Sequence, residues 1–213
     1  MSDLDNNQKI LVEKALELHK TGKIKDAINL YLKIISNNEN NSQLLFLLGT
    51  AQVQLGEMKN GVKNLKKSLS IRPDNASAHS NLGNAFKALN RLEDALNCYN
   101  KAVEINANFS DAYNNRGIIL QELKLFDEAL ESYNRAIKIK PNHFFAHSNK
   151  GITLKELNRY DEALASYDKA IEINPKFVEP YNNKGNVLKE LKRYEEAFEN
   201  FKKVMELKID FDY

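Results

Sequence analysis

Cysteine is nearly absent from this chain, since Cys98 is the only one among 213 residues. A single cysteine excludes an internal disulfide and a metal cage built from several cysteines. Long hydrophobic runs are missing as well, because no stretch approaches the roughly 18 apolar residues that span a bilayer. Met1 to Asn7 also lacks the basic and then apolar order of a signal peptide. We therefore expect no membrane insertion and a cytoplasmic location.

An excess of charge of one sign is also lacking. The chain has 31 basic and 29 acidic residues, which gives a net charge of +2. The two signs are interleaved along the sequence, so no face is expected to bind nucleic acid or another polyanion. Composition therefore favours a protein or peptide partner over a nucleic acid or a membrane.

What the chain does have is a period of 34 residues. The same residue type, or a similar one, recurs on this grid in three series: Gly49, Gly83, Gly117, Gly151 and Gly185; Ala27, Gly61, Ala95, Ala129, Ala163 and Ala197; and Tyr31, Leu65, Tyr99, Tyr133, Tyr167 and Phe201. Six units follow one another without insertion. Such a pattern predicts a solenoid in which neighbouring units complete each other's hydrophobic cores.

Each unit is expected to form two helices. In residues 76–109 two runs of apolar residues follow the i, i+3, i+4, i+7 spacing of an amphipathic helix, with Asn90-Arg91 as a short turn between them. Acidic residues open the second helices, where a helix N-terminus favours negative charge, as at Asp94, Asp127, Asp161 and Glu195. No strand pattern is present, so the predicted fold is all-α.

The recurring glycines call for a packing reason. Glycine inside a helix costs about 1 kcal/mol relative to alanine. Overpacking costs about 1–3 kcal/mol, so a glycine is favoured wherever a side chain would collide with the partner helix. We therefore predict that the two helices of a unit approach each other closely at these glycines.

The residues Gly117, Leu120, Ala129, Tyr133, Ala136 and Pro141 resemble the pattern of the tetratricopeptide repeat. The resemblance implies a right-handed α-α superhelix of six 34-residue helix-turn-helix repeats. They would cover 8–41, 42–75, 76–109, 110–143, 144–177 and 178–211, between a flexible tail (1–7) and a short C-terminal end (212–213). Repeats 1 and 2 depart from the pattern at Ala15, Glu39, Gly61 and Ser68, which suits an N-terminal capping role.

Four asparagines, which we call the asparagine ladder, each precede a packing glycine by two residues: Asn81, Asn115, Asn149 and Asn183. Residues two apart on a helix point about 200° apart, so these side chains face away from the contact inside the repeat. The family resemblance places this face in a concave groove. An amide can bond both the C=O and the N–H of a peptide unit, so the ladder is predicted to bind an extended chain. The alternative is a bond to a neighbouring repeat.

Other residues of the first helices are predicted to line the same groove. The polar ones are Ser80, Asn84, Asn114, Ser148, Asn182 and Asn186, and the apolar ones are Ile118, Phe145 and Ile152. The three apolar residues are expected either to form a binding patch or to pack repeat against repeat. The lysines of a carboxylate clamp, the chaperone-tail site of some tetratricopeptide proteins, are missing, because Asp111 and Glu179 stand where that clamp is basic.

The run from Ala78 to Lys87 and the run from Asn182 to Glu190 resemble repeats of O-linked N-acetylglucosamine transferases and SPINDLY-like fucosyltransferases. This resemblance implies a second function, as the substrate-recognition region of a glycosyltransferase whose catalytic domain lies elsewhere. A third possibility is self-association through a C-terminal face that no polar helix caps.

No residues suggest catalysis, a metal or a cofactor. His79 and His147 share a repeat position with Tyr113 and Tyr181, which indicates packing. His143 and His147 are four apart but have no third ligand. Cys98 has no paired histidine, so an inert, partly buried thiol is expected. We therefore expect a binding protein and not an enzyme.

Overall fold

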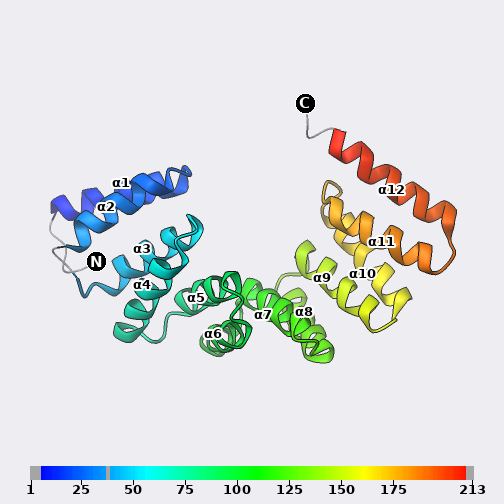
Figure 1. The fold of residues 1–213 in the computed structure, drawn as a ribbon, viewed down its shortest axis with the longest axis horizontal. Helices are drawn as coiled ribbons and strands as arrows, with labels where there is room; N and C mark the ends of the chain where they lie inside the picture. The colour runs from blue at the N-terminus through cyan, green and yellow to red at the C-terminus, as the bar shows by residue number, and fades with distance from the viewer. Residues whose placement is uncertain (1–5, 37–38, 210–213) are drawn as a thin grey trace. The chain divides into compact units, whose positions relative to one another are not determined.

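The computed structural model describes residues 6–36 and 39–209, and those residues form α-helices joined by turns, with no strand among them (Figure 1). The helices are α1 (Asn6–Lys20), α2 (Ile24–Ile35), α3 (Ser42–Gln54), α4 (Met58–Ile71), α5 (Ala76–Ala88), α6 (Leu92–Ile105), α7 (Ser110–Glu122), α8 (Phe126–Ile139), α9 (Phe144–Glu156), α10 (Tyr160–Ile173), α11 (Val178–Glu190) and α12 (Tyr194–Ile209). The all-α fold of helix-turn-helix repeats is confirmed. None of the described helices is long and apolar enough to cross a membrane.

The chain divides into two compact units, Met1–Ala107 and Asn108–Tyr213. In the first unit α1 pairs with α2, α3 with α4 and α5 with α6, and α3 also contacts α5. In the second unit α7 pairs with α8, α9 with α10 and α11 with α12, and α9 contacts both α7 and α11. The first helices α7, α9 and α11 therefore form a continuous layer in the second unit, and α3 and α5 lie side by side in the first.

Each predicted repeat holds one helix pair, although the structure leaves parts of the predicted ends undescribed. Residues 1–5 of the predicted tail and residues 212–213 lie outside the described residues. Helix α1 begins at Asn6, so it includes two residues that the repeat grid assigned to the tail.

The glycines lie where the prediction placed them, and the structure adds what they contact. A Cβ on Gly83, Gly117 or Gly151 would come within 2.5–2.8 Å of the ring of the tyrosine 16 residues later, and one on Gly185 would lie 2.7 Å from the Phe201 ring. Real Cβ atoms essentially never come that close. The tyrosine rings are themselves fully buried. The close approach is therefore between a helix backbone and an aromatic ring, and not only between two backbones.

The turns inside the repeats share one backbone conformation. The residue two places after each first helix has a positive φ: Gly22 and Gly56 in the first two repeats, then Asn90, Lys124, Asn158 and Lys192. At Asn90 the surrounding hydrogen bonds, Arg91 N–H to Phe86 O and Asn90 N–H to Lys87 O, close a Schellman motif. This motif ends the first helix and turns the chain into the second within three residues.

The acidic residues predicted to open the second helices do lie in their first turns. Pro73, Pro141 and Pro175 follow the ends of α4, α8 and α10, where a missing N–H disrupts no helical bond. Within the second unit one core cluster joins successive repeats. It holds Leu130, Leu154, Leu164, Tyr167, Val187 and Leu188.

Candidate peptide-binding surface

The asparagine ladder lies on the first helices, and its members are half-buried. Asn81 Nδ2 donates to Thr50 Oγ1 of the preceding repeat at 2.9 Å. Asn149 Nδ2 donates to Asn114 Oδ1 at 3.0 Å, and Asn114 Nδ2 in turn donates to Asn115 Oδ1 at 3.3 Å. At two of the four ladder residues, therefore, one amide N–H forms a hydrogen bond with the neighbouring repeat.

The last rung differs from these. Asn183 is also half-buried, yet none of the described residues forms a hydrogen bond with its side chain. It is the one ladder residue whose amide is not committed to a neighbour within the part of the chain that the structure describes. It therefore allows the binding role of the ladder to be tested apart from a structural one.

The other polar residues predicted to line the groove fall into two groups. Ser80, Asn114 and Ser148 share one repeat position and are buried, and Asn84 accepts a hydrogen bond from Tyr99 Oη at 2.6 Å. Asn182 and Asn186, in the last repeat, are exposed. Ser80, Asn114 and Ser148 therefore contribute little accessible surface, Asn84 is half-buried, and the last-repeat pair is open to solvent.

The predicted apolar residues have different surroundings. Ile152 packs against the core cluster of the second unit, and Ile118 is half-buried. Phe145 is 49% exposed and lies against two other phenylalanines. Its ring centroid is 4.1 Å from that of Phe144 and 5.2 Å from that of Phe177, and those two rings are 5.1 Å apart. We call these three residues the aromatic cluster.

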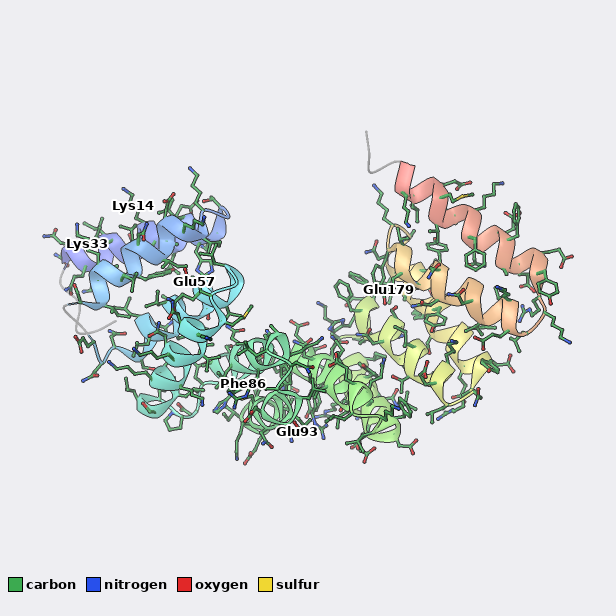
Figure 2. The ribbon with its side chains drawn as sticks, in the orientation of Figure 1. Lys14, Lys33, Glu57, Phe86, Glu93 and Glu179 are labelled. Carbon is green, nitrogen blue, oxygen red and sulfur yellow. The ribbon has the colours of Figure 1, made fainter. Side chains whose placement is uncertain are left out.

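Charged groups lie beside this cluster. His143, whose ring centroid is 6.5 Å from that of Phe145, has Nε2 3.1 Å from Asp111 Oδ1. Nε2 of His143 is buried beside the Asp111 carboxylate. Burial lowers the pKa of His143, and the Asp111 carboxylate opposes that shift. Glu179, at the start of α11, occupies the repeat position of Asp111 and Phe145, and it is exposed (Figure 2).

Four of these neighbours were not among the predicted site residues: Phe144, Phe177, His143 and Asp111. His143 and Phe177 are the last residues of two successive repeats, and Asp111 and Phe144 lie at the second and first positions of those same repeats. The sequence held a signal, because Phe144-Phe145 is followed 32 residues later by Phe177. The presence of aromatic residues on both sides of the repeat junctions would have predicted that the three phenylalanines lie together.

The residues considered for chemistry have structural roles. His79 Nε2 lies 2.9 Å from Pro73 O, His147 Nε2 lies 3.0 Å from Pro141 O, and Tyr181 Oη donates to Pro175 O at 3.2 Å. These bonds fix the start of a first helix to the turn before it. Burial, with Asp94, raises the pKa of the half-buried Cys98 thiol to about 11, which disfavours a thiolate. The described residues contain no group of side chains suited to a metal ion.

Comparison with family models identifies the class of protein. A model described as TPR repeat matches residues 49–90, 83–124 and 151–192, and models described as tetratricopeptide repeat match 110–143, 132–165 and 178–208. The matches to the first model alone cover more than half of the chain. The chain therefore belongs to the tetratricopeptide repeat family, and its fold is the helical solenoid of that family.

Solved structures with the same fold include MamA and YrrB. A MamA crystal structure is 26% identical over 79% of this chain and 92% of its own, with a TM-score of 0.70. MamA from Desulfovibrio magneticus RS-1 is 19% identical over 81% and 97%, with a TM-score of 0.74. YrrB, a TPR protein with an unusual peptide-binding site, is 21% identical over 84% and 93%, with a TM-score of 0.68. No curated protein sequence matches this chain.

The fold is one that typically serves protein–protein interaction, and it is a type of scaffold that is generally not catalytic. It fixes where interaction surfaces can form, namely on the layer of first helices, on the layer of second helices and at the two ends of a stack. Which of these surfaces is used has to come from the side chains.

Proposed function

We propose that this chain is a protein-interaction scaffold that binds an extended segment of a partner protein along its layer of first helices. The observation that carries the proposal is the exposure of Phe145 within the aromatic cluster. Aromatic side chains that are exposed together and backed by a rigid helix are common anchors in protein interfaces. In the second unit the aromatic cluster would contact a large apolar side chain of the bound segment.

Comparison with the other repeats supports a role in binding over a role in folding. The residues equivalent to Phe145 are Lys9, Gln43, Ser77, Asp111 and Glu179. All five are polar or charged, and the same helix pair forms in each repeat. Folding therefore does not require an aromatic residue at this position.

The ladder would supply the second part of the binding mode. At Asn149 one N–H of the amide holds the neighbouring repeat, which leaves Oδ1 as an acceptor for a peptide N–H. Each such hydrogen bond contributes about 0.5–1.5 kcal/mol net. Hydrogen bonds from a few ladder asparagines give only modest affinity. The apolar contact with the aromatic cluster is therefore needed for useful and selective binding.

The experiment uses an array of extended peptides and two single variants of the full chain. Phe145→Ser, which installs the residue found at Ser77, should weaken peptides with a large apolar side chain about tenfold or more. Glu179→Ser, at the equivalent exposed position one repeat later, is the matched control and should leave that preference unchanged. Equal binding by Phe145→Ser and the unaltered chain would rule out the anchor.

Asn183→Ala tests the ladder without removing a bond between repeats. If the ladder binds peptide backbone, this variant should weaken all peptides about equally, by about two- to tenfold. Asn149→Ala, which does remove such a bond, shows in its melting temperature how much of the ladder is structural. Unchanged peptide binding by both variants would make the asparagines purely structural.

A second candidate function is substrate recognition for a protein glycosyltransferase. It is supported by the occurrence of asparagine at the same position in four successive repeats, as in the transferase-like arrays that this region resembles. This function predicts capture of many unrelated peptides through their backbone. The array separates the two candidates through Phe145→Ser, because apolar peptides that bind this variant as well as the unaltered chain favour the transferase-like function. Loss confined to apolar peptides in Phe145→Ser favours a selective scaffold.

A further inference from the structure

Helix α4 carries positive charge without any negative charge. It contains Lys59, Lys63, Lys66 and Lys67 and no acidic residue. The first three are exposed and lie four and three residues apart, so they share one face of the helix. We call these three the lysine row. Lys66 Nζ lies 5.5 Å from the centroid of the Phe86 ring, a contact that does not neutralise its charge. The row lies on a second helix, whereas the asparagine ladder lies on the first helices.

In repeats 3, 5 and 6 the basic residues of the second helices are neutralised by ion pairs along the same helix. Two pairs per repeat, each between residues three apart, have N–O distances of 2.6–3.1 Å: Arg91–Asp94, Lys101–Glu104, Arg159–Glu162, Lys169–Glu172, Arg193–Glu196 and Lys203–Glu206. The equivalent positions of repeat 2 hold Glu57 with Asn60, and Lys67 with Ser70. Neither combination is an ion pair, and no lysine of α4 forms one with any residue that the structure describes.

The repeat fold does not require these lysines. In repeats 3 to 6 the position of Lys59 is acidic, with Glu93, Asp127, Asp161 and Glu195. The position of Lys63 is not basic in any other repeat, and its equivalents are Asn29, Asn97, Glu131, Ala165 and Glu199. The same helix pair forms in every repeat. Like charges three or four residues apart slightly destabilise a helix, so the lysine row is explained better by a ligand than by folding.

The carboxylates closest to the row along the chain and on α6 are held by other groups. Glu57 Oε2, just ahead of α4, accepts hydrogen bonds from Gln52 Nε2 at 3.3 Å and from Asn60 Nδ2 at 3.2 Å. Asp94 on α6 is paired with Arg91 at 2.6 Å. The positive charge of the lysine row is therefore available to an external anion.

The charges of the neighbouring second helices limit the width of the basic surface. The exposed charged residues are Lys25, Asp26 and Lys33 on α2, and Glu93 with the paired Lys101 and Glu104 on α6. Packed helices lie about 8–10 Å apart, and α6 packs on α5, which packs on α4, so α6 is within about 20 Å of α4. A bilayer or a nucleic-acid duplex laid on α4 would therefore also meet Glu93 (Figure 2). A narrow anionic chain that follows α4 avoids it.

We propose that the lysine row binds an extended acidic segment of a partner protein. Residues three or four apart on a helix have their Cβ atoms about 5–6 Å apart. Alternate residues of an extended chain point to one side and lie about 6.6–6.8 Å apart. Acidic residues at i, i+2 and i+4 of the segment can therefore each lie against one lysine. The chain then has a second binding surface, on a different layer of helices from the surface of first helices.

The probes are two labelled peptides of equal length, one in which glutamate alternates with serine and one in which glutamine replaces the glutamate. Binding to the full chain is measured by fluorescence anisotropy. At about 20 mM salt the glutamate peptide should bind about tenfold more tightly than the glutamine peptide, because only its side chains pair with the lysines. Most of this preference should disappear at about 0.3 M salt, since exposed charges are screened there.

Charge reversal in the row tests the site. Lys59→Glu with Lys63→Glu should remove the preference for the glutamate peptide. The matched control is Lys9→Glu with Lys20→Glu on α1, which changes the net charge equally and should leave the preference in place. All four lysines are exposed, so the melting temperature should stay close to that of the unaltered chain. None of them belongs to the aromatic cluster or the asparagine ladder, so failure here leaves the first proposal intact.

Three results would overturn the proposal. The first is equal binding of the two peptides at low salt, and the second is a preference that survives in the Lys59→Glu, Lys63→Glu variant. The third is tighter binding to a DNA duplex, or to vesicles of phosphatidylserine and phosphatidylcholine, than to the glutamate peptide, when the same variant abolishes it. That result would mean that the lysine row binds a nucleic acid or a membrane surface and not a protein segment.

Discussion

The two ends of the chain carry the same repeat but present opposite surfaces. Helix α1 exposes Lys14 and Glu17 at positions that pack against the preceding repeat in other parts of the chain. Helix α12 exposes Tyr194, Phe198 and Met205 at positions that pack against the following repeat. The helix pairs are alike, so the 34-residue period alone does not determine whether the outermost helix exposes polar or apolar residues. Terminal repeats of a solenoid usually carry a polar outer face, and α1 has polar residues at these positions whereas α12 has apolar ones.

The largest effect is expected from comparing one position in the last two repeats. Leu164→Ala should lower the free energy of unfolding by about 2–5 kcal/mol, because α11 covers this side chain. Phe198→Ala, one period later, should change it by less than about 0.5 kcal/mol, because the ring is exposed. Urea unfolding of both variants checks the difference. A cost above about 2 kcal/mol for Phe198→Ala would mean that the Phe198 side chain is covered in solution.

A smaller effect is expected where the first repeat departs from the others. Gly151→Ala should cost about 1–3 kcal/mol, since its Cβ would lie 2.5 Å from the Tyr167 ring. Repeat 1 already has Ala15 at this position, buried together with Tyr31. The control is Ala15→Gly, which should not stabilise the chain. Thermal melts of the two variants are sufficient, and a neutral Gly151→Ala would show that the ring moves aside freely.

The turns offer a third comparison, with an effect of the opposite sign. Lys192 has a φ of 60°, whereas the equivalent Gly22 and Gly56 occupy the same left-handed region without a Cβ. Lys192→Gly should therefore raise the free energy of unfolding by about 1 kcal/mol. Lys138→Gly, inside α8, should lower it by about 1 kcal/mol. Destabilisation by Lys192→Gly would mean that the lysine side chain makes contacts worth more than the relief of backbone strain.

The smallest effect concerns pH. Burial is the main cause of the lowered pKa of both His143 and His147. Below the unfolded-state pKa of about 6.5 the unfolded chain binds protons that the folded chain does not, so stability should fall as pH decreases from 7.5 to 5. His143→Gln with His147→Gln should flatten this slope in urea midpoints measured at the two pH values. A rise in stability toward pH 5 would contradict the burial argument.

Much of the fold could be predicted from the sequence because the signal is repeated. A helix pair that recurs on one grid removes most doubt about where helices begin and which residues face the core, as at Gly117 and Ala129. The turn between the helices was expected, but its left-handed residue was not, because lysine at Lys124 or Lys192 gives no such signal. Those residues adopt a positive φ because helix packing on both sides fixes the turn.

The candidate surface was harder to predict, since it depends on contacts between repeats. A period shows which residues share a position but not which neighbour each one meets. The bond from Asn81 to Thr50 links residues 31 apart, and the one from Asn149 to Asn114 links residues 35 apart. Likewise Phe145 was expected beside Ile118 and Ile152, and the structure groups it with Phe144 and Phe177. The offset between stacked helices sets these partners, and sequence spacing alone does not give that offset.

The carboxylate of Glu17 gives the array a direction of growth. A 34-residue duplication inserted after any later repeat would bring a small or apolar residue to the surface that it must cover, as Val187 does in the last repeat. A duplication placed ahead of α1 would enclose Glu17 in an apolar contact and would be selected against. A repeat added ahead of α1 should therefore cost more stability than one inserted between two later repeats.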